Sequence, residues 1–138
     1  MSDLIALFAL ALLLGGMVFF AAVIAPLVFT RLPAPQAGGF IRAVFPFYYL
    51  YVFLTSAVAA LALAPLPAAV AVALIAAMTI WLRQWLMPRI NVFSDAAQAG
   101  DRAAKHRFDR AHRLSVAVNL AQMLIAGGVL VRFTSHGG

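Results

Sequence analysis

Residues 11–29 have the sequence ALLLGGMVFFAAVIAPLVF, in which no side chain is charged. A stretch this apolar predicts a membrane-spanning helix, because roughly 20 helical residues cross the hydrocarbon core of a bilayer. We expect the span to cover residues 4–30, which is long enough to tilt or to project beyond the bilayer. The chain therefore begins with a transmembrane helix.

The composition indicates that the rest of the chain is also embedded in a membrane. Of the 138 residues, 65% are hydrophobic and only 10% are charged, whereas a soluble domain carries about 25% charged residues. Further spans are predicted over residues 47–64, 67–87 and 104–133. The expected fold is all-α: one transmembrane domain over residues 1–138, built as an up-down-up-down four-helix bundle.

The three connections between these helices differ in character. The second is the uncharged PLP of residues 65–67, which predicts a tight hairpin because proline ends one helix and can start the next. In the first, Pro33, Pro35 and the Gly38-Gly39 pair predict a break, followed by a short interfacial helix over residues 40–45. Residues 88–112 predict the only extended hydrophilic connection, with the fourth helix starting from about Asp101.

Lys and Arg residues predict the orientation. The second connection and the two chain ends have Arg132 alone, while the first and third connections with their adjoining helix ends hold nine such residues: Arg31, Arg42, Arg83, Arg89, Arg102, Lys105, Arg107, Arg110 and Arg113. Cytoplasmic loops carry an excess of Lys and Arg. We therefore expect these two connections in the cytoplasm and both termini on the non-cytoplasmic side.

Several functions are excluded or disfavoured by residue content. The absence of cysteine excludes thiol catalysis, disulfides and thiolate metal sites. The net charge of +6 lies in loops between spans, so the expected partner is the lipid bilayer and not nucleic acid. No phosphate-binding glycine loop, carboxylate pair or Ser/His/Asp arrangement is evident, so enzymatic activity is less expected than a non-enzymatic role.

Polar residues on the fourth helix form the main candidate site. His112, Ser115, Asn119 and Gln122 are spaced by 3, 4 and 3, which puts them on one helix face that descends into the membrane. Such residues tend to face a bundle interior and are functional candidates. One interpretation is the lining of a polar substrate path. The other is interhelical hydrogen bonding, and the two are compatible.

Other candidates surround this polar stripe. Arg113 is expected beside His112 at the cytoplasmic mouth, with Tyr48 or Tyr49 across from it. Two further candidates, Arg83 and Asn91, lie near the end of the third helix, as an anion-binding or interface-anchoring arginine and as a cap or partner-binding amide. Helix packing is expected of a separate group in the first helix, where small residues permit close approach and proline permits a kink: Gly15, Gly16 and Pro26.

The histidines do not predict a metal site. His106 and His112 are six residues apart and point in different directions on a helix, so they cannot share one metal without further ligands. No metal and no cofactor is predicted. Haem b, with His112 as its ligand, is the alternative that stays open.

Four segments in order resemble the transmembrane protein 205-like family: GGMVFFAAVIAPLVFTRLP, FPFYYLYVF, MPRIN and FDRAHRLSVAVNL. The resemblance covers almost the whole chain and implies a four-helix protein of the bacterial inner membrane, with eukaryotic relatives linked to drug resistance and vesicle traffic. It brings no established reaction. The positions that carry it are Gly15, Gly16, Phe19, Pro26, Phe29, Pro33, Phe45, Pro46, Tyr48, Tyr49, Pro88, Asn91, His112, Ser115 and Asn119.

The chain is also similar to the small haem-binding membrane protoporphyrinogen oxidases in its length and in the character of its first helix. That family is expected to carry a histidine in or beside the first helix, and this chain has none before His106.

Three functions are therefore open. The leading hypothesis is a small transporter, channel or export-associated protein, forming a homo-oligomer because one four-helix protomer has little interior volume; its substrate is unknown. The alternatives are a haem- or porphyrin-binding oxidoreductase and an assembly factor that docks a partner through the basic connection.

Overall fold

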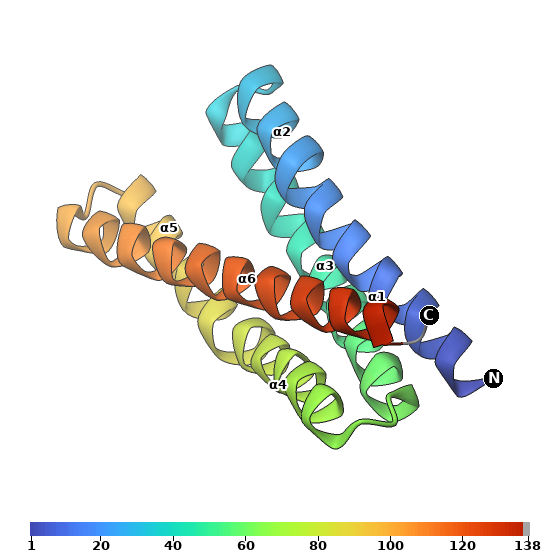
Figure 1. Cartoon of the computed structure of the whole chain (residues 1–138). Coiled ribbons are helices and arrows are strands. Elements are labelled where there is room, and N and C mark those ends of the chain that lie inside the picture. Colours follow the sequence, from blue (N-terminus) through green and yellow to red (C-terminus); the bar gives the residue numbers. More distant parts are fainter. Residues whose placement is uncertain (137–138) are drawn as a thin grey trace.

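A computed structural model describes residues 1–136, which are helical apart from short turns. Four long helices follow one another over Ser2–Arg31, Ala34–Ala62, Leu66–Gln98 and Arg102–His136. The chain reverses direction at each turn (Figure 1), so the start of the first helix, the end of the last and the turn after Ala62 lie at the same end of the molecule. All four are long and apolar enough to cross a membrane.

Two of the long helices contain a π-helical turn shortly before a proline. The first is composed of α1 (Ser2–Phe19), the π-helical turn η1 (Phe20–Ile24) and α2 (Ala25–Arg31). The third is composed of α4 (Leu66–Trp81), the π-helical turn η2 (Leu82–Leu86) and α5 (Met87–Gln98). In each, proline is the second residue after the π turn: Pro26 and Pro88.

The π turns explain how these helices continue through proline. Proline has no backbone N–H, and its ring collides with the carbonyl of the residue four positions earlier in an α-helix. One wider turn changes that spacing and lets the helix resume on the other side. The sequence predicted that the third helix ends near residue 87. This prediction is wrong, because the helix continues to Gln98.

The second helix, α3 (Ala34–Ala62), also begins earlier than predicted. The expected break and separate interfacial helix over residues 40–45 are wrong, because α3 is continuous from Ala34 and includes Pro46. Pro33 precedes α3 and Pro35 lies in its first turn, where the missing N–H has no intrahelical partner to lose. Gly38 and Gly39 lie within the helix.

The predicted hydrophilic connection is mostly helix as well. The turn between α5 and α6 (Arg102–His136) covers only residues 99–101. Gly100 has φ +101°, a conformation that favours glycine at the end of a helix. The N–H of Asp101 bonds to the carbonyl of Ala96 (3.1 Å), and its carboxylate accepts the N–H of Ala104 (3.2 Å). These bonds end one helix and cap the next.

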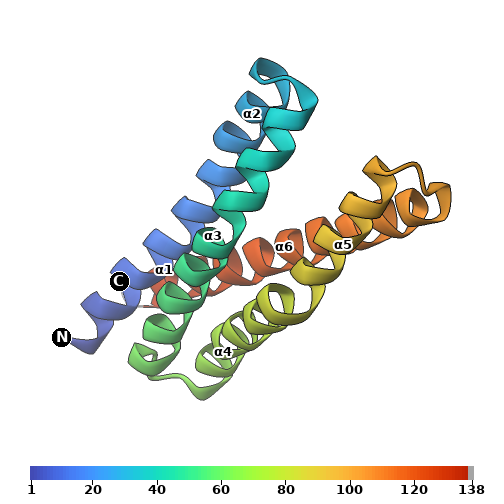
Figure 2. The same ribbon diagram turned by 180° about the vertical axis from the view of Figure 1, so that it is seen from behind.

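The four helices pack tightly at the end that holds the termini and diverge at the other. Small buried residues allow the close approach there: Ala6 and Ala9 of α1 with Ala59 of α3. Figures 1 and 2 show that two arms separate above this region. We call them the α2–α3 arm (residues 25–46) and the α5–α6 arm (residues 87–115).

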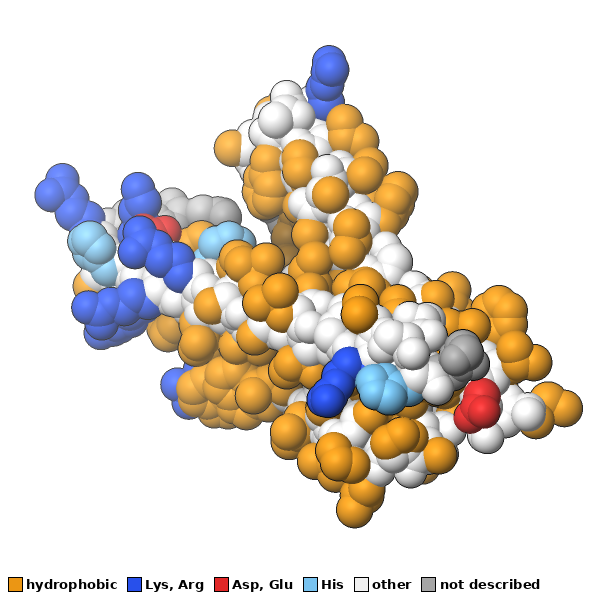
Figure 3. Space-filling model, viewed as in Figure 1, with side chains coloured by type: hydrophobic (Ala, Val, Ile, Leu, Met, Phe, Trp, Pro, Cys, Tyr) orange, Lys and Arg blue, Asp and Glu red, His pale blue; other side chains and the backbone are white. Residues whose placement is uncertain are grey.

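The outer surface is apolar. Large side chains such as Phe8 (65% exposed) and Leu124 (78% exposed) cover it, and Figure 3 shows them over most of one face, with Lys and Arg side chains gathered at the end of the α5–α6 arm. A surface of this kind is stable in lipid and not in water. The molecule is therefore a multi-pass membrane protein.

Candidate functional site

A cleft lies between the two arms. Its volume is about 260 Å³, and the hollow between the arms is visible in Figure 3. We call it the inter-arm cleft. The α2–α3 arm contributes Phe29, Pro35, Gly38, Gly39, Ile41, Arg42 and Phe45, and Tyr49 of α3 lies just beyond this arm. The α5–α6 arm contributes Met87, Ile90, Asn91, Ser94, Gln98, Phe108, His112 and Ser115.

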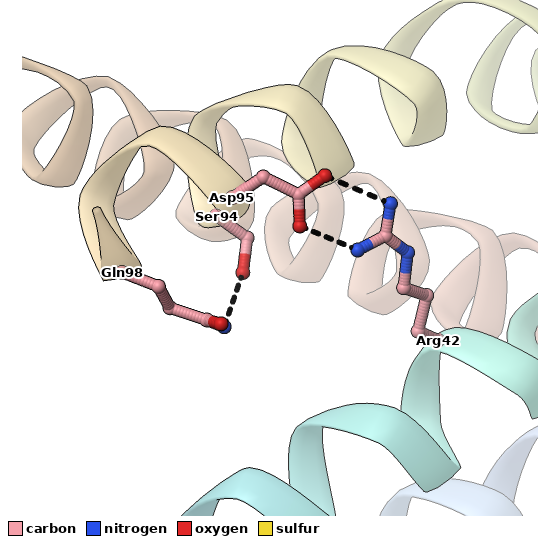
Figure 4. A network of polar contacts seen from close by, with 4 residues as sticks. All are labelled: Arg42, Ser94, Asp95 and Gln98. Carbon is pink, nitrogen blue, oxygen red and sulfur yellow. Dashed lines mark hydrogen bonds and ion pairs between the residues drawn. The ribbon is translucent and has the colours of Figure 1, made fainter.

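An ion pair joins the two arms across this cleft. The guanidinium of Arg42 in α3 contacts both carboxylate oxygens of Asp95 in α5, with N–O distances of 2.7 and 3.2 Å (Figure 4). Both side chains are exposed, at 47% and 59%. Beside them, the Gln98 amide donates to the hydroxyl of Ser94 (3.3 Å). The ion pair is thus an accessible link between otherwise separate arms.

Aromatic side chains close the cleft on its inner side. The rings of Phe45 and Tyr49, which line the cleft, stack with centroids 5.4 Å apart, and Tyr48 stacks on Phe20 at 4.3 Å. Such stacked pairs pack rigidly in addition to burying apolar area. Phe45 and Tyr49 therefore form an aromatic floor of the inter-arm cleft, and Phe20 and Tyr48 pack against them.

We call the first two long helices (Ser2–Ala62) the first hairpin and the last two (Leu66–His136) the second hairpin. Two polar bonds connect these hairpins at the floor. The hydroxyl of Tyr48 in α3 donates to the Asn119 side-chain oxygen in α6 at 2.9 Å. Nearby, Nε of Arg83 in η2 donates to the carbonyl of Pro46 in α3 at 3.3 Å. Asn119 and Arg83, both predicted as site residues, thus hold helices together and are not among the lining residues.

The polar stripe on α6 divides at Asn119. Above it, His112 and Ser115 line the cleft; the His112 ring stacks on Phe108 at 5.8 Å, and the Ser115 hydroxyl donates to the His112 carbonyl at 2.7 Å. Below it, the buried Gln122 amide donates to the Ile75 carbonyl (3.2 Å) and the Thr79 hydroxyl (3.1 Å) of α4. The upper half of the stripe therefore lines a cavity, and the lower half forms interhelical hydrogen bonds.

The remaining predicted residues are distributed as follows. Tyr49 and Asn91 line the inter-arm cleft. Arg113 is exposed and does not line it. A Cβ added to Gly16 would collide with the ring of Tyr51, whereas one added to Gly15 would meet no atom within 4 Å. Close packing against α3 therefore occurs at Gly16.

The sequence did not single out Asp95, Ser94 and Gln98, and it assigned Arg42 only an orienting role. The reason is that residues 88–112 were expected to be mainly a connection, so their side chains had no predicted neighbours. One available signal was the scarcity of acidic residues, with only four in the chain. A carboxylate in so basic a protein has many potential partners. In the structure, Asp95 pairs with Arg42.

Among the described residues, no group of three or more His, Cys, Asp or Glu side chains is arranged to hold a metal ion. The polar groups of the inter-arm cleft are instead one guanidinium, one imidazole, hydroxyls and amides. These groups bind oxygen atoms and anions by hydrogen bonding and charge.

The fold and the cleft define a class: a small multi-pass helical membrane protein with a cavity between two helical hairpins. Within that class, the chain belongs to DUF4149, a family defined by a domain of unknown function, which matches residues 8–99. The match covers both walls of the inter-arm cleft except the part that α6 contributes. No curated protein and no solved structure matches the chain.

Proposed function

We propose that this protein is a small membrane transporter that binds its substrate in the inter-arm cleft. The observation that carries the proposal is the shape of the cavity: the arms diverge at one end of the molecule, while the aromatic floor and the Tyr48–Asn119 bond (2.9 Å) close the other. A cleft that is open on one side and closed on the other has the form of one state of an alternating-access cycle.

The basic residues support a cytoplasmic opening. Nine of the ten Lys and Arg residues belong to the connections at the arms and to the helix ends beside them. By the positive-inside rule this end faces the cytoplasm, with both termini outside. The resemblance to the transmembrane protein 205-like family supports a bacterial inner membrane location. A homo-oligomer is part of the proposal because a single protomer encloses only about 260 Å³.

The π-helical turns supply positions for movement. η1 and η2 each precede a proline and lie where an arm leaves the packed region. Proline leaves a carbonyl without its helical partner, so such turns bend at low cost. We propose that the arms close over substrate by bending there, in the manner of hinge motions in other proteins.

Cysteine accessibility tests the proposal, since the native chain has no cysteine. Ser115→Cys places a thiol in the cleft wall, and a membrane-impermeant maleimide is added to either face of oriented proteoliposomes. Ala103→Cys at the arm end and Ala64→Cys at the opposite turn are the matched reporters of sidedness. A transporter exposes residue 115 to each face in turn, so labelling from both faces is expected. Labelling from the arm side alone contradicts alternating access.

A second candidate rests on the basic surface in Figure 3. Arg102, Lys105 and Arg107 are all exposed at the start of α6, and such a surface can dock an acidic partner or anionic lipid. Changing these three residues to Glu should then abolish co-purification of the partner while two-sided labelling of Ser115→Cys is retained. Unchanged co-purification removes this candidate.

The haem alternative rests on His112, whose imidazole lines the cleft. An absorption spectrum of the purified protein, before and after addition of haem b, tests it directly. A Soret band that is lost in His112→Ala supports a haem site. No band in either sample removes the alternative and leaves the transporter proposal as it stands.

A further inference from the structure

We propose that the inter-arm cleft is selective for small amphipathic anions, in which one carboxylate or phosphate group binds Arg42 in place of Asp95 and an apolar body fills the cavity. This inference rests on the proposed function, because it names the substrate class of the same cleft. The two ends of such a molecule correspond to two different parts of the lining.

The charged end is selected by an asymmetry in the Arg42–Asp95 pair. Arg42 is among the residues that line the cleft, whereas Asp95 is not, and no other acidic residue lines it. The pair is neutral while Asp95 is bound, and the wall of the cavity becomes cationic when this carboxylate leaves Arg42. A ligand inside the cavity can reach the guanidinium, which presents five N–H donors in a planar fork and binds carboxylate or phosphate through two of them.

Exchange of the carboxylate is physically feasible because the pair is exposed. Arg42 and Asp95 are 47% and 59% accessible, so water and solutes screen their attraction. A ligand that brings its own apolar surface has an advantage over the side chain, since its body is removed from water at the same time. Asp95 acts as a competitor that holds the guanidinium in position until a ligand replaces it.

The apolar end is selected by the rest of the lining. Phe29, Ile41 and Phe45 face the cleft from the α2–α3 arm, and Met87 and Ile90 face it from the α5–α6 arm. The volume of about 260 Å³ lies just below the roughly 300–1,000 Å³ of typical ligand pockets. A short chain or a single ring fits this space better than a large drug-like molecule.

Polar neutral residues complete the match. The Ser94 hydroxyl and the Gln98 amide lie next to the ion pair in Figure 4 and both line the cleft. These groups can donate to the remaining oxygen atoms of a bound carboxylate or phosphate. None of them repels an anion, and Arg42 is the charged side chain among the lining residues. The lining is therefore complementary to a negative head group.

Direct binding of three matched probes tests the inference. Radiolabelled octanoate, octylamine and octanol share one apolar chain and differ in charge, and each is measured on the full chain in nanodiscs, with empty nanodiscs subtracted. Saturable binding of octanoate, with octylamine and octanol at least about tenfold weaker, is expected from one charge-assisted head-group contact. Equal binding of the three probes overturns anion selectivity, and so does saturable binding of none.

Substitutions at the ion pair locate the head group. Arg42→Gln should weaken octanoate binding about tenfold, while the same change at Arg132, at the far end of α6, should leave it unchanged. Asp95→Asn removes the competitor and should strengthen binding, whereas a purely structural ion pair predicts weaker binding in both variants. Arg42→Lys keeps the charge and loses the planar fork, so it should bind octanoate more weakly than the native chain and more strongly than Arg42→Gln. If Arg42→Gln does not fold, the weaker binding of Arg42→Lys still tests the head-group contact.

Failure of this inference can be distinguished from failure of the proposed function. Two-sided labelling of Ser115→Cys together with equal binding of the three probes retains the transporter and overturns its anion selectivity. One-sided labelling together with selective octanoate binding retains the anion site and overturns transport.

Discussion

Tyr48 and Asn119, which are 71 residues apart in the chain, are joined by a hydrogen bond of 2.9 Å that links α3 of the first hairpin to α6 of the second. Tyr48 is buried at 7% exposure and stacks on Phe20. The bond lies under the inter-arm cleft, where the hairpins meet. It therefore ties together the two halves that diverge above it.

A double-mutant cycle of Tyr48→Phe and Asn119→Leu measures this link. Each single change should lower the free energy of unfolding in detergent by about 1 kcal/mol, the scale of a net hydrogen bond in proteins and membrane bundles. The double variant should lose less stability than the sum of the two single losses, because the hydrogen bond is already broken by the first change. Strict additivity would mean that the two side chains do not interact. Thr134→Val, at an exposed position near the end of α6, is the control.

Gly16 and Gly15 form a matched pair of neighbouring glycines. An alanine Cβ at residue 16 would collide with the Tyr51 ring, so the ring must move and its hydroxyl must leave the Leu12 carbonyl. Gly16→Ala should therefore lower stability by about 1–3 kcal/mol, while Gly15→Ala should be neutral or slightly stabilising. Thermal unfolding in detergent measures both. Equal effects at the two positions would contradict the close approach of α1 and α3.

Gln122→Leu tests whether the lower half of the polar stripe is packing or path. The substitution removes the bonds to Ile75 and Thr79, and Thr79 keeps its own bond to the Ile75 carbonyl (2.7 Å). We expect a stability loss of about 1 kcal/mol and unchanged labelling of Ser115→Cys from either face. If labelling from the face opposite the arms disappears while the protein stays folded, Gln122 belongs to the substrate path.

Pro88→Ala tests the bending of the α5–α6 arm. Alanine restores the missing N–H and is favoured over proline in a helix by up to about 3 kcal/mol, so the arm should become stiffer and the protein more stable. Spin labels on the two arms should then give a narrower distance distribution. Pro35→Ala is the control, since Pro35 lies in a first helical turn where proline is tolerated. An equal response to both changes would contradict a special role for the π turn before Pro88.

Much of the fold was predictable because it depends on hydropathy along the chain. The charge deficit and the four apolar stretches indicated four membrane helices, and the PLP of residues 65–67 indicated the tight turn before α4. Helix ends were less predictable. Pro88 normally marks a helix end, yet the third helix continues past it after the π turn over Leu82–Leu86. Periodicity in the sequence does not reveal such a turn.

The candidate site was predictable where its residues share one helix. The spacing of His112 and Ser115 put both on the face that lines the inter-arm cleft. The Arg42–Asp95 pair was not predictable, because its partners are 53 residues apart and meet only through the packing of the two hairpins. Spacing along one helix also could not separate the cleft residues from Gln122, whose partners are on α4.

The measurement that most directly tests a substrate cleft that opens and closes is the distance between the arms. Spin labels at Gln36→Cys in α3 and Ala103→Cys in α6 report it by double electron–electron resonance in nanodiscs, with Thr30→Cys and Gln36→Cys as a control pair within one arm. We predict two inter-arm distances, with octanoate shifting the population toward the shorter one, and a single unchanged distance in the control. A single inter-arm distance that no probe alters would contradict the proposed transport cycle.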